Sequence, residues 1–345
     1  MSKLAHPLQS KRSDPLQATV FCGVDVSAAT LAVAIQQDDQ PLEQREFANN
    51  ASGHKALIAC LHKRKAWARV SLEATGIYSL DLALAAAEQI EVAVLNPKVV
   101  NRFAQTLRRS KTDSADAQAL AEYSRRMPFT AWRAPSRNGL QLRTISRHID
   151  GLTVEHTREQ NRLHAAQGSS ATPGCVMQDL KHSLASLQRR ILKLRRQAMA
   201  LIRCEEALQR RFDLMISIPG IAQISALQLL GELAPLSAEM SVRQWVAHSG
   251  LDPVHEVSGS SVHRPSRISR AGNRHLRRAL YMPALVAVQH DPHLQAFYKI
   301  LQSRHKAKLQ ALIAVARKLL HAIYGIFRNL TPYDGRKLFP ALILG

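Results

Sequence analysis

The first third of the chain alternates short apolar runs with polar breaks, a pattern that predicts strands joined by helices. The run from Thr19 to Val26 has the continuous apolar character of a buried strand, and alternating apolar positions predict a second strand at about 30–36. A third strand is expected near 43–48. Beyond it the pattern predicts a helix at about 52–63, a strand ending at Glu73, a helix near 80–89 and a strand at about 92–95.

Three strands followed by alternating helices and strands form the order of a ribonuclease-H-like, or RuvC-like, α/β fold. We assign this domain to residues 19–135, because strand signals disappear beyond the segment Ala134-Pro135-Ser136. The polar residues 1–18 are expected to form a disordered N-terminus.

The middle of the chain carries a heptad-like pattern, which we assign to a helical coiled-coil arm at residues 136–212. A run rich in Gly, Ser and Pro at 168–174 divides the arm into two helices, and either an antiparallel hairpin or a dimerising stalk fits. Residues 213–345 are expected to form a compact helical domain. The apolar residues at alternating three- and four-residue spacing are Leu180, Leu184, Leu187, Ile191, Leu194, Ala198, Leu201, Leu208 and Phe212, broken only by Glu205.

The charge balance points to a polyanionic partner. The chain has 47 Lys and Arg against 26 Asp and Glu, a net charge of +21, and such an excess favours phosphate binding through counterion release. Nucleic acid and an anionic membrane would both satisfy it. The longest apolar stretch, around 279–288, is about half of the roughly 20 residues that a membrane span needs. We therefore expect a soluble cytoplasmic protein that binds nucleic acid and has no membrane partner.

Acidic residues interrupt segments that otherwise favour apolar side chains. Asp25 lies inside the first strand and Glu73 ends a later one, whereas Asp113 and Asp116 stand three apart at the start of a predicted helix. Such a pair shares one helix face, although Asp in a first turn also simply complements the helix dipole. Clustered carboxylates repel one another, and hard divalent ions prefer oxygen ligands. The set Asp25, Glu73, Asp113 and Asp116 predicts a Mg²⁺ site that would position phosphate oxygens.

Basic segments and one tight turn are candidates for contact with nucleic acid. Pro219-Gly220 precedes a helix expected at 223–233 and resembles a helix-hairpin-helix turn, whose backbone N–H groups contact phosphate; a purely structural turn is the alternative. On the arm, Arg195 and Arg196 either touch nucleic acid or are only solvated. No acidic residue lies between Glu256 and Asp291, a segment that contains Arg264, Arg267, Arg270, Arg274, Arg277 and Arg278.

Ser258 begins the run Ser258-Gly259-Ser260-Ser261 at the start of this basic segment. A serine hydroxyl is a poor nucleophile unless it is activated, and a neighbouring metal or guanidinium cluster can activate it. On these residues alone, the simpler interpretation is a Gly-Ser loop whose hydroxyls bind DNA phosphates.

Taken together, these motifs resemble the DEDD transposases of insertion sequences, the IS110 family, which includes the Piv-type DNA invertases. The resemblance covers about residues 19–330. The matching segments include Gly23-Val24-Asp25-Val26-Ser27, Glu73-Ala74-Thr75-Gly76, Lys111-Thr112-Asp113-Ser114-Ala115-Asp116, Ile218-Pro219-Gly220-Ile221, Ser258-Gly259-Ser260-Ser261 and Leu276-Arg277-Arg278-Ala279.

The resemblance implies that the four carboxylates are metal ligands and that the helical C-terminal region is a transposase domain whose Ser258 forms a covalent phosphoserine link to DNA. It also implies a structured noncoding guide RNA, or bridge RNA, that pairs with donor and target DNA. Recombination joins two duplexes, which favours a homodimer or homotetramer near the bacterial nucleoid. The carboxylates and the serine lie on either side of the arm, an arrangement compatible with a site shared between protomers.

Three alternatives to a guided serine recombinase remain at this point. One is a metal-dependent nuclease of Holliday-type junctions without covalent chemistry, in which Ser258 only binds phosphate. A second is a DNA invertase that reads its sites without a guide RNA. The third is a basic architectural protein, for which the carboxylates would be dispensable and salt would abolish binding steeply.

Overall fold

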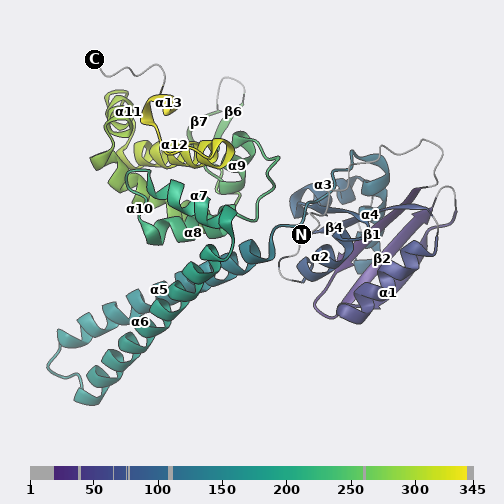
Figure 1. Cartoon of the computed structure of the whole chain (residues 1–345), viewed down its shortest axis with the longest axis horizontal. Helices are drawn as coiled ribbons and strands as arrows, with labels where there is room; N and C mark the ends of the chain where they lie inside the picture. Colours follow the sequence, from purple (N-terminus) through teal and green to yellow (C-terminus); the bar gives the residue numbers. More distant parts are fainter. Residues whose placement is uncertain are drawn as a thin grey trace, which may run out of the picture. The chain divides into compact units, whose positions relative to one another are not determined.

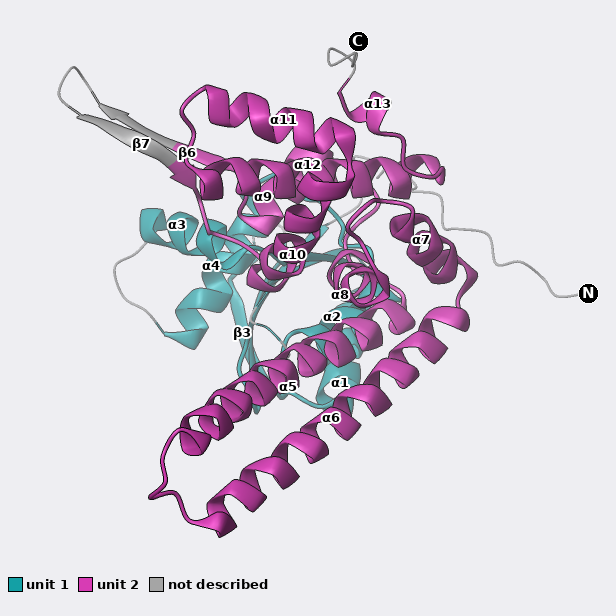
Figure 2. Ribbon diagram, turned by 90° about the vertical axis from the view of Figure 1, so that its left-hand side faces the viewer, with its two compact units in different colours: residues 1–134 teal, residues 135–345 magenta. Residues whose placement is uncertain are grey.

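The computed structural model describes residues 19–37, 40–64, 66–74, 76, 78–107, 112–258 and 262–339, without side-chain detail at 255–258 and 262–266. The chain divides into two compact units, residues 1–134 and 135–345 (Figure 2). The disorder predicted for residues 1–18 and the roles predicted for the side chains of Ser258 and Arg264 lie outside the described part of the chain.

Unit 1 is built on one five-stranded sheet in the order β3-β2-β1-β4-β5. β1 pairs antiparallel with β2, and β2 with β3, whereas β4 runs parallel to both β1 and β5. The mixed α/β organisation predicted from the apolar pattern is therefore confirmed. The strands are β1 (Thr19–Val26), β2 (Thr30–Gln37), β3 (Glu43–Ala48), β4 (Trp67–Glu73) and β5 (Glu91–Leu95).

The two faces of this sheet are packed differently. On one face, alternate β1 residues such as Val24 join Leu57 of α1 (Ala51–His62) and Leu82 of α2 (Leu80–Ala87) in a single core. On the other face, α4 (Asp113–Arg126) lies so close that a Cβ at Gly23 would be 2.1 Å from the carbonyl oxygen of Ala117. Small side chains on this face therefore allow α4 to sit directly on the central strands.

One helix of unit 1 was not predicted. α3 (Pro97–Leu107) begins at a proline shortly after the end of β5 at Leu95. Proline suits the first position of a helix, because its missing N–H has no helical partner there and its φ is already helical.

Unit 2 begins with two long helices, α5 (Arg137–Gln167) and α6 (Gly174–Arg203), which lie side by side as an antiparallel hairpin (Figure 1). Ile191 and Ala198 of α6 are buried in the same core as Ile149 of α5. The arm predicted to continue to residue 212 instead ends at Arg203, and Leu208 and Phe212 belong to α7 (Glu206–Ile216). The apolar pattern is interrupted here only by Glu205 and keeps its phase across the turn, and for this reason it predicted a single arm to residue 212.

The remaining helices pack around α12 (Lys308–Asn329) and continue the core of the arm. α12 contains an 18-residue window of mean hydropathy 1.3, so among the described helices its length and composition would suit a membrane span. Leu319 and Leu320 are fully buried, and α12 serves here as a core helix. The other elements are α8 (Gln223–Leu233), α9 (Val242–Ser249), α10 (Arg274–His290), α11 (Pro292–Ser303) and α13 (Gly335–Leu338).

The expectation that no strands follow residue 136 is wrong. β6 (Pro253–Ser258) and β7 (Val262–Ile268) form a two-stranded antiparallel sheet between α9 and α10. The strands contain His, Glu, Ser and Arg among their valines, so the apolar alternation that marks a strand is weak. A glycine-containing connection between two valine-bearing segments was the signal that could have predicted a hairpin.

Candidate active site

Strand alternation places Asp25 and Glu73 on the face of the sheet that α4 covers. Asp25 follows Gly23 by two residues in β1, and Gly23 contacts α4. In β4, Val70 and Leu72 join the core on the opposite face, so Glu73 faces α4 as well. Val24 and Leu72 are partners across the parallel pair, and Asp25 and Glu73 are the next residue on each strand. The two carboxylates therefore stand beside each other at the carboxyl ends of adjacent strands.

The other two carboxylates arise from the first turn of α4. Thr112 caps this helix by accepting a hydrogen bond from the backbone N–H of Ala115 at 3.2 Å, so neither aspartate is needed as the cap. Asp113 is exposed and Asp116 is half-buried. Because α4 packs on β1 and β4, the start of this helix brings both aspartates to the face that carries Asp25 and Glu73.

The pKa of Asp25 is raised by the other three carboxylates of the set. The pKa of Asp25 is raised from 3.8 to about 6, first by burial and then by the charges of Asp116, Asp113 and Glu73, while a hydrogen bond from the backbone of Val26 lowers it. Like charges from a neighbouring strand and a helix therefore converge on a half-buried carboxylate.

The donor set suits a hard divalent cation, because every group offers carboxylate oxygen. The repulsion around Asp25 is the kind that such a cation relieves. Among the described residues, however, no three His, Cys, Asp or Glu side chains are gathered closely enough to hold a metal ion. Metal binding would therefore require the carboxylates to turn toward one another from the face they already share.

Ser258 is the last residue of β6, opposite Val262 of β7. The hairpin is anchored at its base, where the backbone N–H of Ser269 donates to the carbonyl of Asp252 at 2.9 Å. The hydroxyl of Ser269 also donates to Oδ1 of Asp252, at 2.5 Å. Ser258 thus stands at the end of β6 remote from this base.

The arginines around the hairpin differ in what they contact. Arg267 and Arg274 are exposed, and Arg270 has a φ of 54°, in the left-handed region. Nη1 of Arg277 donates to the carbonyl of Ser249 at 2.8 Å, and burial with the nearby Arg270 lowers the pKa of Arg277. Arg278 forms an ion pair with Asp150 at 3.2 Å. Contact with nucleic acid stays a prediction for Arg264, Arg267, Arg270, Arg274, Arg277 and Arg278.

The Pro219-Gly220 turn has a clear structural role. Gly220 has a φ of +94°, and a Cβ there would lie 2.6 Å from the carbonyl oxygen of Pro283 in α10. Glycine is therefore required by the close approach of the turn to α10. The exposed start of α8 has no side-chain cap, so phosphate contact at this turn also stays a prediction.

On the arm, Arg196 is exposed, whereas Arg195 is half-buried and its Nε has no hydrogen-bond partner. Sequence analysis missed a further charged residue, Glu232, which is 3% exposed in the apolar helix α8. A glutamate in the run Leu229-Leu230-Gly231-Glu232-Leu233 was the available signal. Its partners are distant in sequence and could not be identified from that signal.

Comparison with known proteins gives matches to both units. Residues 22–166 match the DEDD transposase model of IS110 type, described as "Transposase", and residues 213–299 match "Transposase IS116/IS110/IS902 family". The pilin gene-inverting protein of Moraxella bovis is 31% identical over 322 residues, covering 92% of this chain and 98% of that protein. An insertion element IS116 protein of Streptomyces clavuligerus is 22% identical, with 90% and 95% covered. An insertion element IS110 protein of Streptomyces coelicolor is 26% identical, with 48% and 40% covered.

Proposed function

The chain belongs to the IS110 family of DEDD transposases, and on that premise we propose that it recombines DNA with a Mg²⁺-binding carboxylate site and a nucleophilic Ser258. Membership makes it an enzyme that cleaves and rejoins DNA. A relative named for inverting a pilin gene is consistent with this, because inversion and transposition both cut and rejoin strands.

The observation that carries the proposal is the convergence of three carboxylates on Asp25. A fold that served only as a basic scaffold would have no reason to place four acidic groups on one face of a protein with a net charge of +21. The strand order β3-β2-β1-β4-β5, with β2 antiparallel to β1 and β4 parallel to it, supports a ribonuclease-H-like fold for unit 1. Asp25 then lies on the central strand of the sheet.

In this proposal Asp25, Glu73, Asp113 and Asp116 hold Mg²⁺, which when bound neutralises negative charge on phosphate oxygens. The contribution of the protein is position, because two carboxylates come from the ends of adjacent strands and two from the first turn of a packed helix. Without the cation the same groups would repel a DNA phosphate.

The serine step conserves the number of phosphodiester bonds. The hydroxyl oxygen of Ser258 forms a bond to phosphorus, the bond from phosphorus to the departing strand breaks, and the serine proton ends on the departing oxygen. Rejoining reverses these changes with a different strand, so the cycle needs no external energy source. The location of Ser258 at the end of β6 supports this role, because a residue remote from the anchored base of a hairpin can approach a duplex.

The partners follow from the same proposal. Donor and target DNA are the substrates, and the charge of +21 suits several phosphate contacts. We further propose a noncoding guide RNA and a homodimer or homotetramer that acts at the bacterial nucleoid. Exposed Arg196 on the arm and exposed Arg274 near the hairpin are available to such nucleic acids.

The test uses nicked suicide DNA that traps covalent intermediates. The DNA would carry the element ends, and RNA that co-purifies with the protein would be sequenced and added back. We expect denaturation-resistant protein–DNA adducts in Mg²⁺ that disappear in Ser258→Ala and persist in the control Ser260→Ala. Adducts that persist in Ser258→Ala would overturn the serine assignment. Cleavage with free 5′-phosphate and 3′-hydroxyl ends and no adduct would instead identify a metal-dependent junction nuclease.

A further inference from the structure

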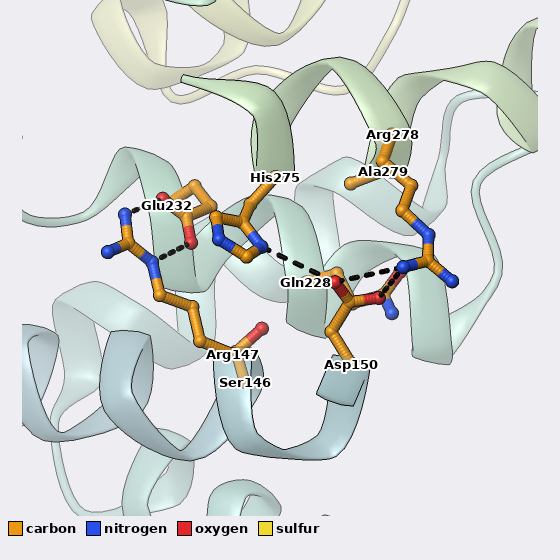
Figure 3. A pocket seen from close by; sticks show the side chains of 8 residues that line it. All are labelled: Ser146, Arg147, Asp150, Gln228, Glu232, His275, Arg278 and Ala279. Atoms are coloured by element: carbon orange, nitrogen blue, oxygen red, sulfur yellow. Dashed lines mark hydrogen bonds and ion pairs between the residues drawn. The ribbon is translucent and has the colours of Figure 1, made fainter. Parts of the chain in front are cut away.

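A cluster of polar side chains joins three helices of unit 2 (Figure 3). On each helix, long polar side chains about one helical turn apart line the same small cavity. The cluster lies where the arm meets the C-terminal helices, because α5 packs against α8 and α8 against α10. Its members are Arg147 and Asp150 of α5, Gln228 and Glu232 of α8, and His275 and Arg278 of α10.

Glu232 is the buried centre of this cluster. Nε and Nη2 of Arg147 donate to its two carboxylate oxygens at 2.7 and 2.8 Å, and Nδ2 of Asn273 donates to Oε2 at 2.6 Å. Burial acts most strongly on this group and would raise its pKa, but the hydrogen bonds from Arg147 and Asn273 and nearby positive charge outweigh burial and lower the pKa of Glu232. The carboxylate is therefore ionised and fully paired.

Stability alone does not account for a glutamate at this position. Glu232 is the only charged residue of α8, and a buried ion pair typically contributes no more stability than apolar residues of the same volume would. The carboxylate instead fixes the positions of its partners, because its hydrogen bonds form only with donors at defined places. Those donors lie 85 and 41 residues away in the sequence.

Asn273 connects Glu232 to the base of the β6–β7 hairpin. Its Oδ1 caps α10 by accepting hydrogen bonds from the N–H groups of His275 and Leu276 at 3.0 and 3.1 Å. Its own N–H donates to the carbonyl of His248 at 2.7 Å. Just before it, the N–H of Arg270 donates to the carbonyl of Gly250 at 3.2 Å. Asn273 thus fixes both the exit of the hairpin and the start of α10.

We propose that Glu232 is a positioning residue that locks the base of the β6–β7 hairpin to the root of the arm. Arg147 belongs to the arm and Asn273 to the hairpin base, and a single carboxylate joins them. The inference rests on the proposed function, because Ser258 is the residue that this arrangement would present to DNA. Glu232 contacts no substrate in this role and acts through Asn273.

Asn273→Ser is the decisive variant. Serine retains a good cap for α10 but removes the amide that donates to Glu232. In the full-length protein we expect the rate of covalent adduct formation on suicide DNA to fall at least tenfold, with the dissociation constant for DNA changed less than twofold. Glu232→Gln, which keeps the volume but loses the charge, should act in the same direction.

Asp150→Asn is the matched control. It weakens the neighbouring contact of Asp150 with His275 and Arg278 between α5 and α10, but leaves Asn273 and the hairpin base untouched. Adduct formation should stay within about twofold of the unaltered protein. An equal loss in Asp150→Asn would show a general loosening of the helices and would overturn the positioning role of Glu232.

Hydrogen exchange provides a readout that does not depend on chemistry at Ser258. The amide hydrogens of Ser269, Arg270 and Asn273 are bonded to the segment before the hairpin, and they should exchange at least tenfold faster in Asn273→Ser but not in Asp150→Asn. Unchanged exchange and adduct formation in Asn273→Ser would refute the inference. Adducts that survive Ser258→Ala would refute the serine mechanism instead, and the exchange data would still test the lock.

Discussion

In the described part of the molecule, the carboxylate cluster around Asp25 and the cluster around Glu232 are in opposite electrostatic states. In unit 1, burial and three neighbouring carboxylates raise the pKa of Asp25 to about 6. In unit 2, Arg147 and Asn273 overcome burial and lower the pKa of Glu232. The printed charges that act on Asp25 are all like charges, and we call this cluster incomplete; Glu232 finds its hydrogen-bond donors within the fold, and we call that cluster complete. Under the proposed function an external cation would complete the first cluster, whereas the second holds unit 2 together.

The largest expected effect comes from neutralising the incomplete cluster. Asp25→Asn or Asp113→Asn should reduce DNA cleavage by about a thousandfold or more, because in the proposed function phosphoryl transfer depends on charge stabilisation by the metal assigned to these groups. The measurement is strand cleavage in Mg²⁺ on the suicide substrate. Asp81→Asn is the control, since Asp81 is an exposed aspartate in the first turn of α2. If Asp25→Asn and Asp113→Asn both still cleave DNA, the carboxylates take no part in the reaction.

Removing the carboxylate of the complete cluster should lower the stability of the fold. Glu232→Ala leaves Arg147 and Asn273 without their acceptor, and we expect the free energy of unfolding to fall by about 2–3 kcal/mol, less than for a fully buried pair because Arg147 is 42% exposed. Urea denaturation of unit 2, followed by circular dichroism, would measure this loss. The double variant Arg147→Met with Glu232→Leu should recover most of it. If adduct formation also recovered, the ion pair would have no positioning role.

Removing the charge of Asp25 should stabilise unit 1, whereas removing the charge of Glu232 should destabilise unit 2, and the effect in unit 1 is expected to be smaller. A folded-state pKa near 6 against 3.8 means that ionised Asp25 destabilises the fold fully above pH 6, and that this cost disappears as the pH falls toward 4. Two pKa units correspond to about 3 kcal/mol, which solvent screening of this half-exposed group reduces to about 1 kcal/mol. Asp25→Asn should therefore stabilise unit 1 by about 1 kcal/mol at pH 8 in EDTA.

Urea denaturation at pH 8 and pH 4 checks this sign. The advantage of Asp25→Asn should be largely lost at pH 4, where the folded forms of both proteins are uncharged at this position. Addition of Mg²⁺ at pH 8 should stabilise the unaltered protein more than the variant, since ligand binding shifts stability by mass action. A variant that is less stable than the unaltered protein at pH 8 would contradict the repulsion inferred around Asp25.

The smallest effects are expected from single arginines outside both clusters. Arg196→Ala should weaken nucleic-acid binding a few-fold and reduce the slope of log affinity against log salt by about 0.9, the amount expected for one phosphate contact with a duplex. Arg278→Ala should change the slope less, because Arg278 is already paired with Asp150. Fluorescence anisotropy over a salt series distinguishes the two. Equal slopes would show that pairing with Asp150 leaves Arg278 free to contact phosphate.

Local pattern was sufficient for much of unit 1. Alternating and continuous apolar runs predicted β1 to β5 in order, and Asp25 and Glu73 were notable because they break those runs. The pair Asp113 and Asp116 could be placed on one helix face from spacing alone. The local pattern did not predict β6 and β7, because their many polar residues leave no clear apolar alternation. It also did not predict the end of α6 at Arg203, because the apolar spacing continues in phase beyond that residue.

The sequence by itself determined the α/β order, the helical arm, the net charge and the identity of the acidic residues, because each of these depends on near neighbours in the chain. Only the tertiary structure decided that Asp25 of β1 is repelled by carboxylates of β4 and α4, and that Arg147 and Asn273 stabilise the ionised form of Glu232. The physical reason is that the ionisation of a buried group depends on the charges and donors a few ångströms away in space. For both clusters these neighbours come from distant segments that only folding brings together.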